Sequence, residues 1–196
     1  MARTAEITRT TAETDIRLSL DLDGSGAGTR TTGVGFFDHM LDLFARHGLL
    51  DLTVTTKGDT QTGSHHTVED TGIVLGQAVS EALGDRSGIT RYGAATIPMD
   101  ETLARCAIDL SGRPFTAVNA PQLVPGVTGG FEHELLEEFV RAFANGARAT
   151  IHLDVLAGTN AHHVIEGSFK ALARAVRQAV AIDPRETGIP STKGSL

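Results

Sequence analysis

Two five-residue stretches of this chain share one pattern, and both carry side chains that ligate metals. They are His65-His66-Thr67-Val68-Glu69 and His162-His163-Val164-Ile165-Glu166, each of the form H-H-x-x-E. Residues four apart lie on one face of a helix, so the first His and the Glu of each stretch can chelate one ion. The second His projects roughly 100° away, where it could serve another ion or another subunit. Imidazole mixed with carboxylate, without thiolate, suits Mn²⁺, Fe²⁺, Co²⁺ or Zn²⁺.

The likeness between these stretches extends along the chain and indicates an internal duplication. Glu13-Thr14, Asp21-Leu22 and Gly24 recur as Glu101-Thr102, Asp109-Leu110 and Gly112, in each case 88 residues later. Both copies alternate like strands and continue with a helical segment, 38–46 or 134–145, and a strand, 50–56 or 149–155. The H-H-x-x-E motif then opens an amphipathic helix, 68–83 or 164–180.

This order of elements predicts an α+β fold made of two similar halves. Each half is expected to be a mostly antiparallel sheet with helices packed on one face. We assign residues 1–92 to the first half, 93–181 to the second and 182–196 to a C-terminal tail, all within one compact domain. The tail contains two prolines and two glycines, so it is expected to be irregular.

A further candidate ligand, His39, lies in an apolar helical pattern of the first half. It precedes Leu52, in a predicted strand, by thirteen residues, and Glu138 precedes the matching Ile151 by the same number. Local sequence likeness instead matches His39 to His133. A duplication should keep the spacing within a helix–strand unit, so we expect Glu138 to be the equivalent ligand, with His133 as the alternative.

Composition excludes several other kinds of protein. The hydrophobic content is 40%, without the run of about 20 apolar residues that a membrane helix needs. The N-terminus lacks the apolar core of a signal peptide. The single Cys106 cannot form an internal disulfide and suits a reducing compartment. A net charge of −7, with no Trp, argues against nucleic-acid binding. We expect a cytoplasmic protein with neither membrane nor nucleic-acid partners.

Together, several motifs resemble the imidazoleglycerol-phosphate dehydratase family of histidine biosynthesis, from about residue 3 to the C-terminus. They are Phe37-Asp38-His39-Met40-Leu41, His65-His66-Thr67-Val68-Glu69-Asp70, Pro98-Met99-Asp100-Glu101, Asp109-Leu110-Ser111-Gly112-Arg113-Pro114, Ala161-His162-His163, Phe169-Lys170-Ala171 and Pro190-Ser191-Thr192-Lys193-Gly194. The resemblance implies a duplicated α+β fold, two Mn²⁺ per active site and a 24-subunit shell with active sites at subunit interfaces.

The resemblance also implies a set of metal ligands. They are His39, His65, His66, Glu69, His162, His163 and Glu166. Most members of the family carry His where this chain has Glu138, and some carry Gln where it has Leu43. A carboxylate is nevertheless a competent Mn²⁺ ligand.

The reaction of the family removes water from D-erythro-imidazole-glycerol phosphate and gives imidazole-acetol phosphate. The hydrogen to be lost is on carbon, so the resemblance implies a route through a metal-bound imidazolate and a diazafulvene-like intermediate. Glu13 resembles the substrate-contacting carboxylate of the family and is the leading acid/base candidate. Its duplicate Glu101, with the adjacent Asp100, is the alternative. Glu166 is a candidate for both catalysis and metal binding.

The substrate phosphate requires cations and hydrogen-bond donors. The candidates, which include part of the C-terminal tail, are Arg91, Arg113, Ser191, Thr192 and Lys193. Arg offers a bidentate fork to phosphate, whereas Lys acts as a point charge. Two other hypotheses remain open: a dinuclear metallohydrolase, and a non-catalytic shell in which H-H-x-x-E only joins subunits. The cationic set favours an enzyme, because a structural staple needs no phosphate pocket.

Overall fold

The computed structural model describes residues 2–196 and contains two halves with matching elements. The first half consists of β1 (Thr4–Thr10), β2 (Thr14–Asp21), β3 (Arg30–Thr31), α1 (Gly35–Gly48), β4 (Asp51–Gly58), the short 3-10 helix η1 (Thr60–Thr62) and α2 (His65–Leu83). The second consists of β5 (Tyr92–Met99), β6 (Thr102–Asp109), β7 (Phe115–Asn119), β8 (Val127–Thr128), β9 (Phe131–Glu132), α3 (Leu135–Ala147), β10 (Thr150–Ala157) and α4 (Ala161–Val180).

The two main sheets have the same topology. Their strand orders are β1-β2-β4-β3 and β5-β6-β10-β7. In each sheet the last strand runs parallel to its neighbour, β3 to β4 and β7 to β10, and the other pairs are antiparallel. The remaining strands, β8 and β9, form a small hairpin before α3. The predicted α+β fold with two similar, mostly antiparallel halves is confirmed.

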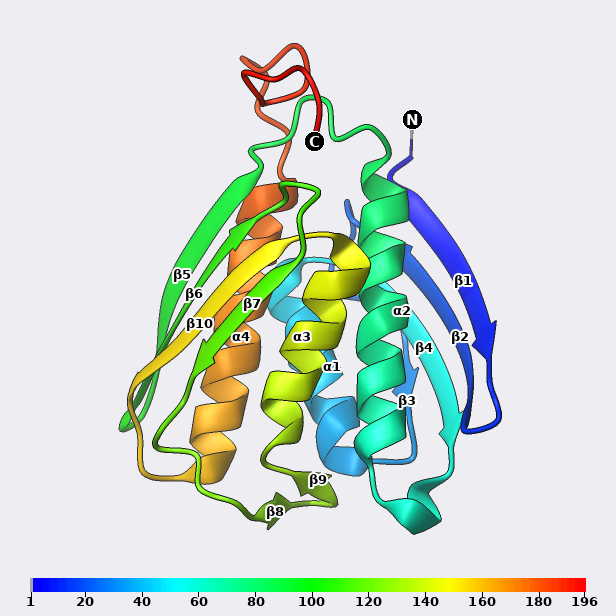
Figure 1. Ribbon diagram of the computed structural model, residues 1–196, viewed down its shortest axis with the longest axis vertical. Coiled ribbons are helices and arrows are strands. Elements are labelled where there is room, and N and C mark those ends of the chain that lie inside the picture. The colour runs from blue at the N-terminus through cyan, green and yellow to red at the C-terminus, as the bar shows by residue number, and fades with distance from the viewer. Residues whose placement is uncertain (1) are drawn as a thin grey trace.

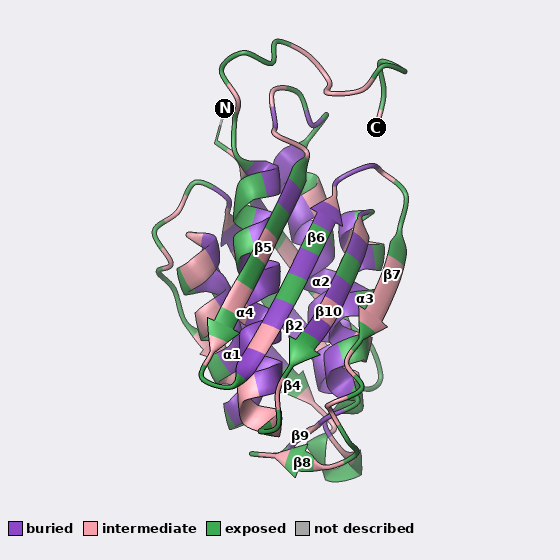
Figure 2. Ribbon diagram, turned by 90° about the vertical axis from the view of Figure 1, so that its left-hand side faces the viewer, coloured by how far each residue is buried: buried purple, intermediate pink, exposed green. Residues whose placement is uncertain are grey.

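The four helices lie in a layer between the two sheets, as Figure 1 shows. The inner faces of the sheets are apolar because side chains alternate along each strand: Ile16, Leu18 and Leu20 of β2 all point into the core. Buried residues follow this alternation along β6 and β10 in Figure 2. Across the layer α2 packs on α3, and α1 packs on α4. The helices of the two halves therefore share one core.

Glycines allow α2 and α3 to approach closely. A Cβ atom at Gly76 of α2 would lie 2.3 Å from the backbone oxygen of Phe143, and one at Gly146 of α3 would lie 2.4 Å from that of Ile73. Neither position can accept a side chain without separating the helices. The close packing fixes the start of α2 relative to the start of α3, and both helix starts carry candidate ligands.

All four helices begin at the same end of the molecule, the lower end in Figure 1. Each H-H-x-x-E motif occupies the first turns of α2 or α4, a little earlier than the sequence pattern predicted. The tail, residues 182–196, forms no helix or strand and lies at the opposite end, so its predicted irregularity is confirmed. None of the described helices is both long and apolar enough to cross a membrane.

Candidate metal centres

One cluster of candidate ligands joins the starts of α1 and α4. It consists of His39, His162 and Glu166, whose ligand atoms all lie within 4.8 Å of one another. Oε2 of Glu166 is 3.1 Å from His162 Nε2 and 3.5 Å from His39 Nε2. The ring of Phe36 packs edge-on against His162, with centroids 5.0 Å apart. Two imidazoles therefore converge on one carboxylate oxygen, an arrangement that suits a divalent cation.

Lys170 keeps the buried carboxylate of this cluster ionised. Its Nζ lies 2.6 Å from Oε1 of Glu166, the oxygen that faces away from the histidines. Burial acts to raise the pKa of Glu166, but the hydrogen bond and charge of Lys170, with contributions from His162 and His39, outweigh it and lower the pKa. The negative charge that a bound cation requires is thus present.

A second cluster joins the starts of α2 and α3. It consists of His65, Glu69 and Glu138, again with ligand atoms within 4.8 Å of one another. His65 Nε2 lies 3.6 Å from Oε2 of Glu69, one turn along the helix. Arg141 holds Glu138, with a guanidinium nitrogen 3.2 Å from Oε1. This cluster is more exposed than the first, and its three side chains leave coordination positions open for other ligands.

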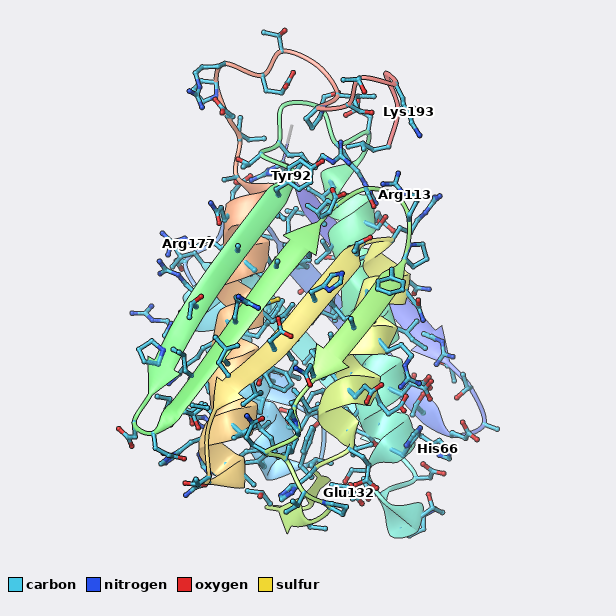
Figure 3. All side chains as sticks on the ribbon, turned by 60° about the vertical axis from the view of Figure 1, so that its left-hand side comes forward. His66, Tyr92, Arg113, Glu132, Arg177 and Lys193 are labelled. Atoms are coloured by element: carbon cyan, nitrogen blue, oxygen red, sulfur yellow. The ribbon has the colours of Figure 1, made fainter. Side chains whose placement is uncertain are left out.

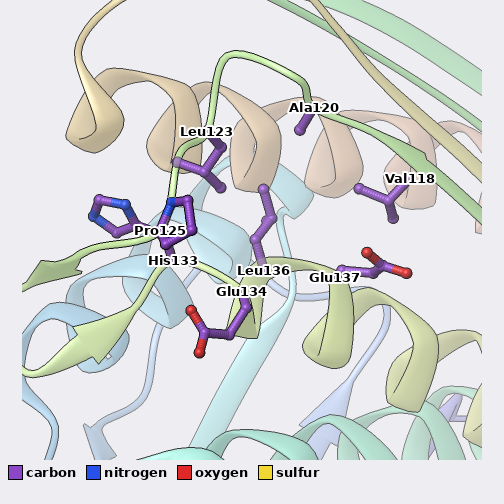
Figure 4. Close-up of a pocket in the computed structure, with 8 residues that line it drawn as sticks. All are labelled: Val118, Ala120, Leu123, Pro125, His133, Glu134, Leu136 and Glu137. Atoms are coloured by element: carbon purple, nitrogen blue, oxygen red, sulfur yellow. The ribbon is translucent and has the colours of Figure 1, made fainter.

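The structure separates His133 from both clusters. Its side chain is buried beside the loop before α3, where it helps to line a cavity of about 210 Å³ (Figure 4). Nδ1 lies 2.8 Å from the carbonyl oxygen of Val124 and must donate to it, while Nε2 lies 2.9 Å from the Thr128 hydroxyl. Both ring nitrogens are therefore engaged in holding this loop. Glu138, and not His133, lies with the candidate ligands.

This placement makes a prediction about metal content. Glu138→Ala is expected to lose roughly one metal equivalent per subunit, because removing a direct ligand weakens affinity by more than the ~10–100-fold of an outer contact. Glu138→His is expected to restore binding. His133→Ala should bind metal nearly normally, although it loses the two hydrogen bonds that hold its loop. Titration of each variant with Mn²⁺ by calorimetry measures the effect, and weakened binding in His133→Ala alone would contradict the assignment.

The second histidine of each motif lies outside the clusters. The ring planes are 85° apart in the His65–His66 pair and 84° apart in the His162–His163 pair, so the two rings of a pair point in different directions, as the sequence predicted. His66 Nδ1 lies 3.1 Å from both carboxylate oxygens of Asp59. Its Nε2 lies 3.6 Å from Oε1 of Glu13. Nε2 of His66 therefore lies beside the carboxylate of Glu13, the leading acid/base candidate.

His163 has a matching arrangement with different residues. Its Nδ1 lies 2.8 Å from Oε2 of Glu101, and its Nε2 lies 3.8 Å from Asp100. The hydrogen bond from His163, followed by those from the backbone of Asn160 and Thr159, lowers the pKa of Glu101 to about 2. The same carboxylate raises the pKa of His163. Glu101 is thus a fixed hydrogen-bond acceptor in this chain.

The candidate phosphate ligands lie at the other end of the molecule. Figure 3 shows Lys193 and Arg113 near the tail, far from His66 at the lower end. Helix α2 has 19 residues and runs from the end with the clusters toward the end with the tail. At 1.5 Å per residue its length is about 28 Å. The tail residues Ser191, Thr192 and Lys193 share this end. Within a single chain, the candidate phosphate ligands and the two ligand clusters therefore do not form one site.

Arg91 is already paired within the chain. Its guanidinium donates to both carboxylate oxygens of Asp109, at 2.7 and 3.1 Å, and to the carbonyl oxygen of Pro190 at 2.8 Å. The last contact anchors the tail beside β5. Arg91 therefore holds the tail at Pro190, the residue that precedes Ser191, Thr192 and Lys193. Lys193 is exposed.

Sequence reasoning assigned no role to three charged residues that contact candidate ligands: Lys170, Arg141 and Asp59. Lys170 lies four residues after Glu166, and helical spacing of opposite charges is a signal that could have found it. Asp59 lies in the loop before α2, where no periodicity applies, and only the folded loop brings it to His66.

Comparison with known proteins identifies relatives over the whole chain. The family model described as Imidazoleglycerol-phosphate dehydratase matches residues 32–176. Proteins of that name from Methylorubrum populi and Moorella thermoacetica are 59% and 58% identical to this chain, covering 99% and 100% of it and 100% of each relative. The crystal structure of the Staphylococcus aureus protein has a TM-score of 0.83 at 42% identity, covering 92% of this chain and 99% of that one. The Pyrococcus furiosus structure, in complex with (S)-C348, has a TM-score of 0.84 at 38% identity, covering 97% and 100%.

Proposed function

The chain belongs to the imidazoleglycerol-phosphate dehydratase family, and from this premise we infer that its two ligand clusters bind Mn²⁺ and form part of a dehydratase active site. The enzyme is a hydro-lyase of histidine biosynthesis. One observation carries the assignment of the site: two clusters of imidazole and carboxylate ligands lie at the same end of the molecule. Mixed nitrogen and oxygen ligands without thiolate fit Mn²⁺.

The proposed substrate is imidazole-glycerol phosphate, whose reacting hydrogen is on carbon and is not acidic. Bound cations would hold the imidazole ring as its anion, because a cation lowers the pKa of its ligand. The adjacent hydroxyl would then leave with a proton as water. The neighbouring C–H of the ring system that remains would be acidic, and loss of its proton would give an enol that rearranges to the ketone. We propose that Glu13 takes this proton. Its position supports this role, because Oε1 lies 3.6 Å from the outward nitrogen of His66.

The separation of the clusters from the tail supports an active site built between subunits. A substrate with three carbons between its ring and its phosphate cannot span about 28 Å. We propose that the helix-start end of one subunit meets the tail end of another, so that Arg113, Ser191 and Lys193 reach the phosphate across the contact. The outward nitrogens of His66 and His163 would likewise complete the coordination of ions held by neighbouring subunits. A 24-subunit shell is the assembly that the family resemblance implies.

We further propose that the enzyme works in the cytoplasm. Its only thiol, Cys106, is fully buried in β6, and burial raises its pKa to about 12. Such a thiol is inert and forms no disulfide, which suits a reducing compartment.

The decisive experiment is an assay with imidazole-glycerol phosphate. The metal-loaded enzyme is expected to form the ketone product, detected by its ultraviolet absorbance, and the metal-free enzyme is expected to form none. Free phosphate is measured in the same reaction as the control. Release of phosphate without ketone would identify a metallohydrolase, and metal binding with neither product would identify a non-catalytic shell.

A further inference from the structure

Glu13 and Glu101 occupy matching positions in the two halves but make different contacts. Glu101 uses its two oxygens for separate tasks: Oε2 accepts a hydrogen bond from His163 Nδ1 at 2.8 Å, and Oε1 accepts from the backbone amides of Thr159 and Asn160 at 3.2 and 2.8 Å. Glu13 forms no side-chain hydrogen bond within residues 2–196, and its side chain is 53% exposed. The duplicated carboxylate is thus held by three hydrogen bonds in one half, whereas in the other its one charged partner is His66, at 3.6 Å.

In the first half Asp59, and not Glu13, contacts Nδ1 of the second histidine of the motif, as Glu101 does in the second half. Both oxygens of Asp59 lie 3.1 Å from His66 Nδ1. The loop that carries it is longer than its counterpart: six residues, 59–64, separate β4 from His65, whereas four, 158–161, separate β10 from His162. The shorter loop contains no carboxylate. A carboxylate therefore faces Nδ1 of both histidines, although the two carboxylates come from different places in the sequence.

We propose that Glu101 and Asp59 are positioning residues that hold His163 and His66 with the proton on Nδ1 and Nε2 free to ligate a metal ion, and that Asp59 thereby releases Glu13 for catalysis. In a neutral imidazole one nitrogen donates and the other accepts. A carboxylate only accepts, so it fixes the proton on the nitrogen that it faces and orients the ring. This inference rests on the proposed function and extends it to residues that do not touch the substrate.

Glu101→Gln is the sharpest variant because it has nearly the same shape but only one acceptor oxygen. If that oxygen stays on the amides of Thr159 and Asn160, the NH₂ group faces His163 and favours the proton on Nε2, which cannot then ligate. If the oxygen turns to His163, the NH₂ group opposes two backbone donors. Either way the side chain can perform only one of its two tasks.

The measurement is retention of metal by the holoenzyme. Each Mn²⁺-loaded protein is incubated with increasing EDTA, and residual metal per subunit is determined by mass spectrometry. Glu101→Gln is expected to release one of its two metal equivalents at a roughly 10- to 100-fold lower EDTA concentration than the unmodified enzyme, the usual effect of losing such an outer contact. Asp59→Ala should behave in the same way. Glu13→Gln should retain metal like the unmodified enzyme.

Asn160→Ala is the matched control for helix capping. The Asn160 side chain accepts from the backbone amides of His162 and His163 at the start of α4, and it does not touch the imidazole of His163. Its loss should lower the melting temperature but leave metal retention within about threefold. Metal loss by Glu101→Gln but not by Asn160→Ala supports the proposal. Full retention by Glu101→Gln, or equal loss by Asn160→Ala, overturns it.

The dehydration assay on the unmodified enzyme separates this proposal from the proposed function. If that enzyme binds Mn²⁺ but forms no ketone, the function is wrong, and the EDTA series still reports on Glu101. If the enzyme is active and Glu101→Gln keeps both metals while kcat falls, Glu101 acts in proton transfer and the positioning role is wrong.

Discussion

Removing divalent metal from the holoenzyme is expected to abolish turnover and to release subunits from the assembly. On the proposed mechanism turnover stops because the substrate ring would no longer be held as its anion, without which the carbon-bound proton is not acidic. The assembly loosens because His66 and His163 lie outside the two clusters of their own chain, and we propose that they ligate ions of neighbouring subunits. Size-exclusion chromatography with light scattering, before and after chelation, measures the second effect.

Readdition of Mn²⁺ is the control for this experiment. Activity and particle size should return together if metal is the only component lost. A large particle that persists unchanged after complete removal of metal would refute the assembly half of the expectation, and the loss of turnover would still stand as a separate result.

Glu13→Gln is expected to lower kcat by at least ~100-fold, the usual scale for a lost general acid or base. The substitution keeps the size of the side chain but removes its basicity. Glu13 makes no contact with the two ligand clusters and is exposed on its own chain, so metal content and particle size should remain normal. Kinetics and metal analysis on the same preparation give the result.

Near-normal kcat with full metal occupancy would move the proton-transfer role away from Glu13. The alternatives are Asp100, which is 78% exposed and 3.8 Å from His163 Nε2, and Glu101. The EDTA series described above distinguishes these two, because a residue that only transfers protons leaves metal retention unchanged.

Much of the site could be predicted because it depends on local geometry. The pairs His65 with Glu69 and His162 with Glu166 meet through the four-residue spacing of a helix, and both pairs do so in the structure. The pairing of Glu138 with the second cluster followed from spacing conserved by duplication. His133 matched His39 only by local sequence likeness. In the structure it lies away from the cluster, beside a loop whose path cannot be predicted from any sequence periodicity.

Other features depend on tertiary structure and could not be predicted in the same way. The sequence places the candidate phosphate ligands and the metal ligands in one chain but does not show that α2 holds them at opposite ends. Nor does it show that Arg91 is paired with Asp109, because β5 and β6 bring these two residues together through sheet register. Such contacts join residues whose separation in sequence follows no repeat.

The placement of ligand clusters at one end and the tail at the other has a genetic consequence. On the proposed arrangement every active site draws on two chains, and the contact between them is head-to-tail. Two inactive chains, one damaged at the helix starts and the other in the tail, can therefore restore activity to each other when they are produced in the same cell. Two chains damaged at the same end cannot. The same arrangement allows one defective allele to silence sites on intact neighbours.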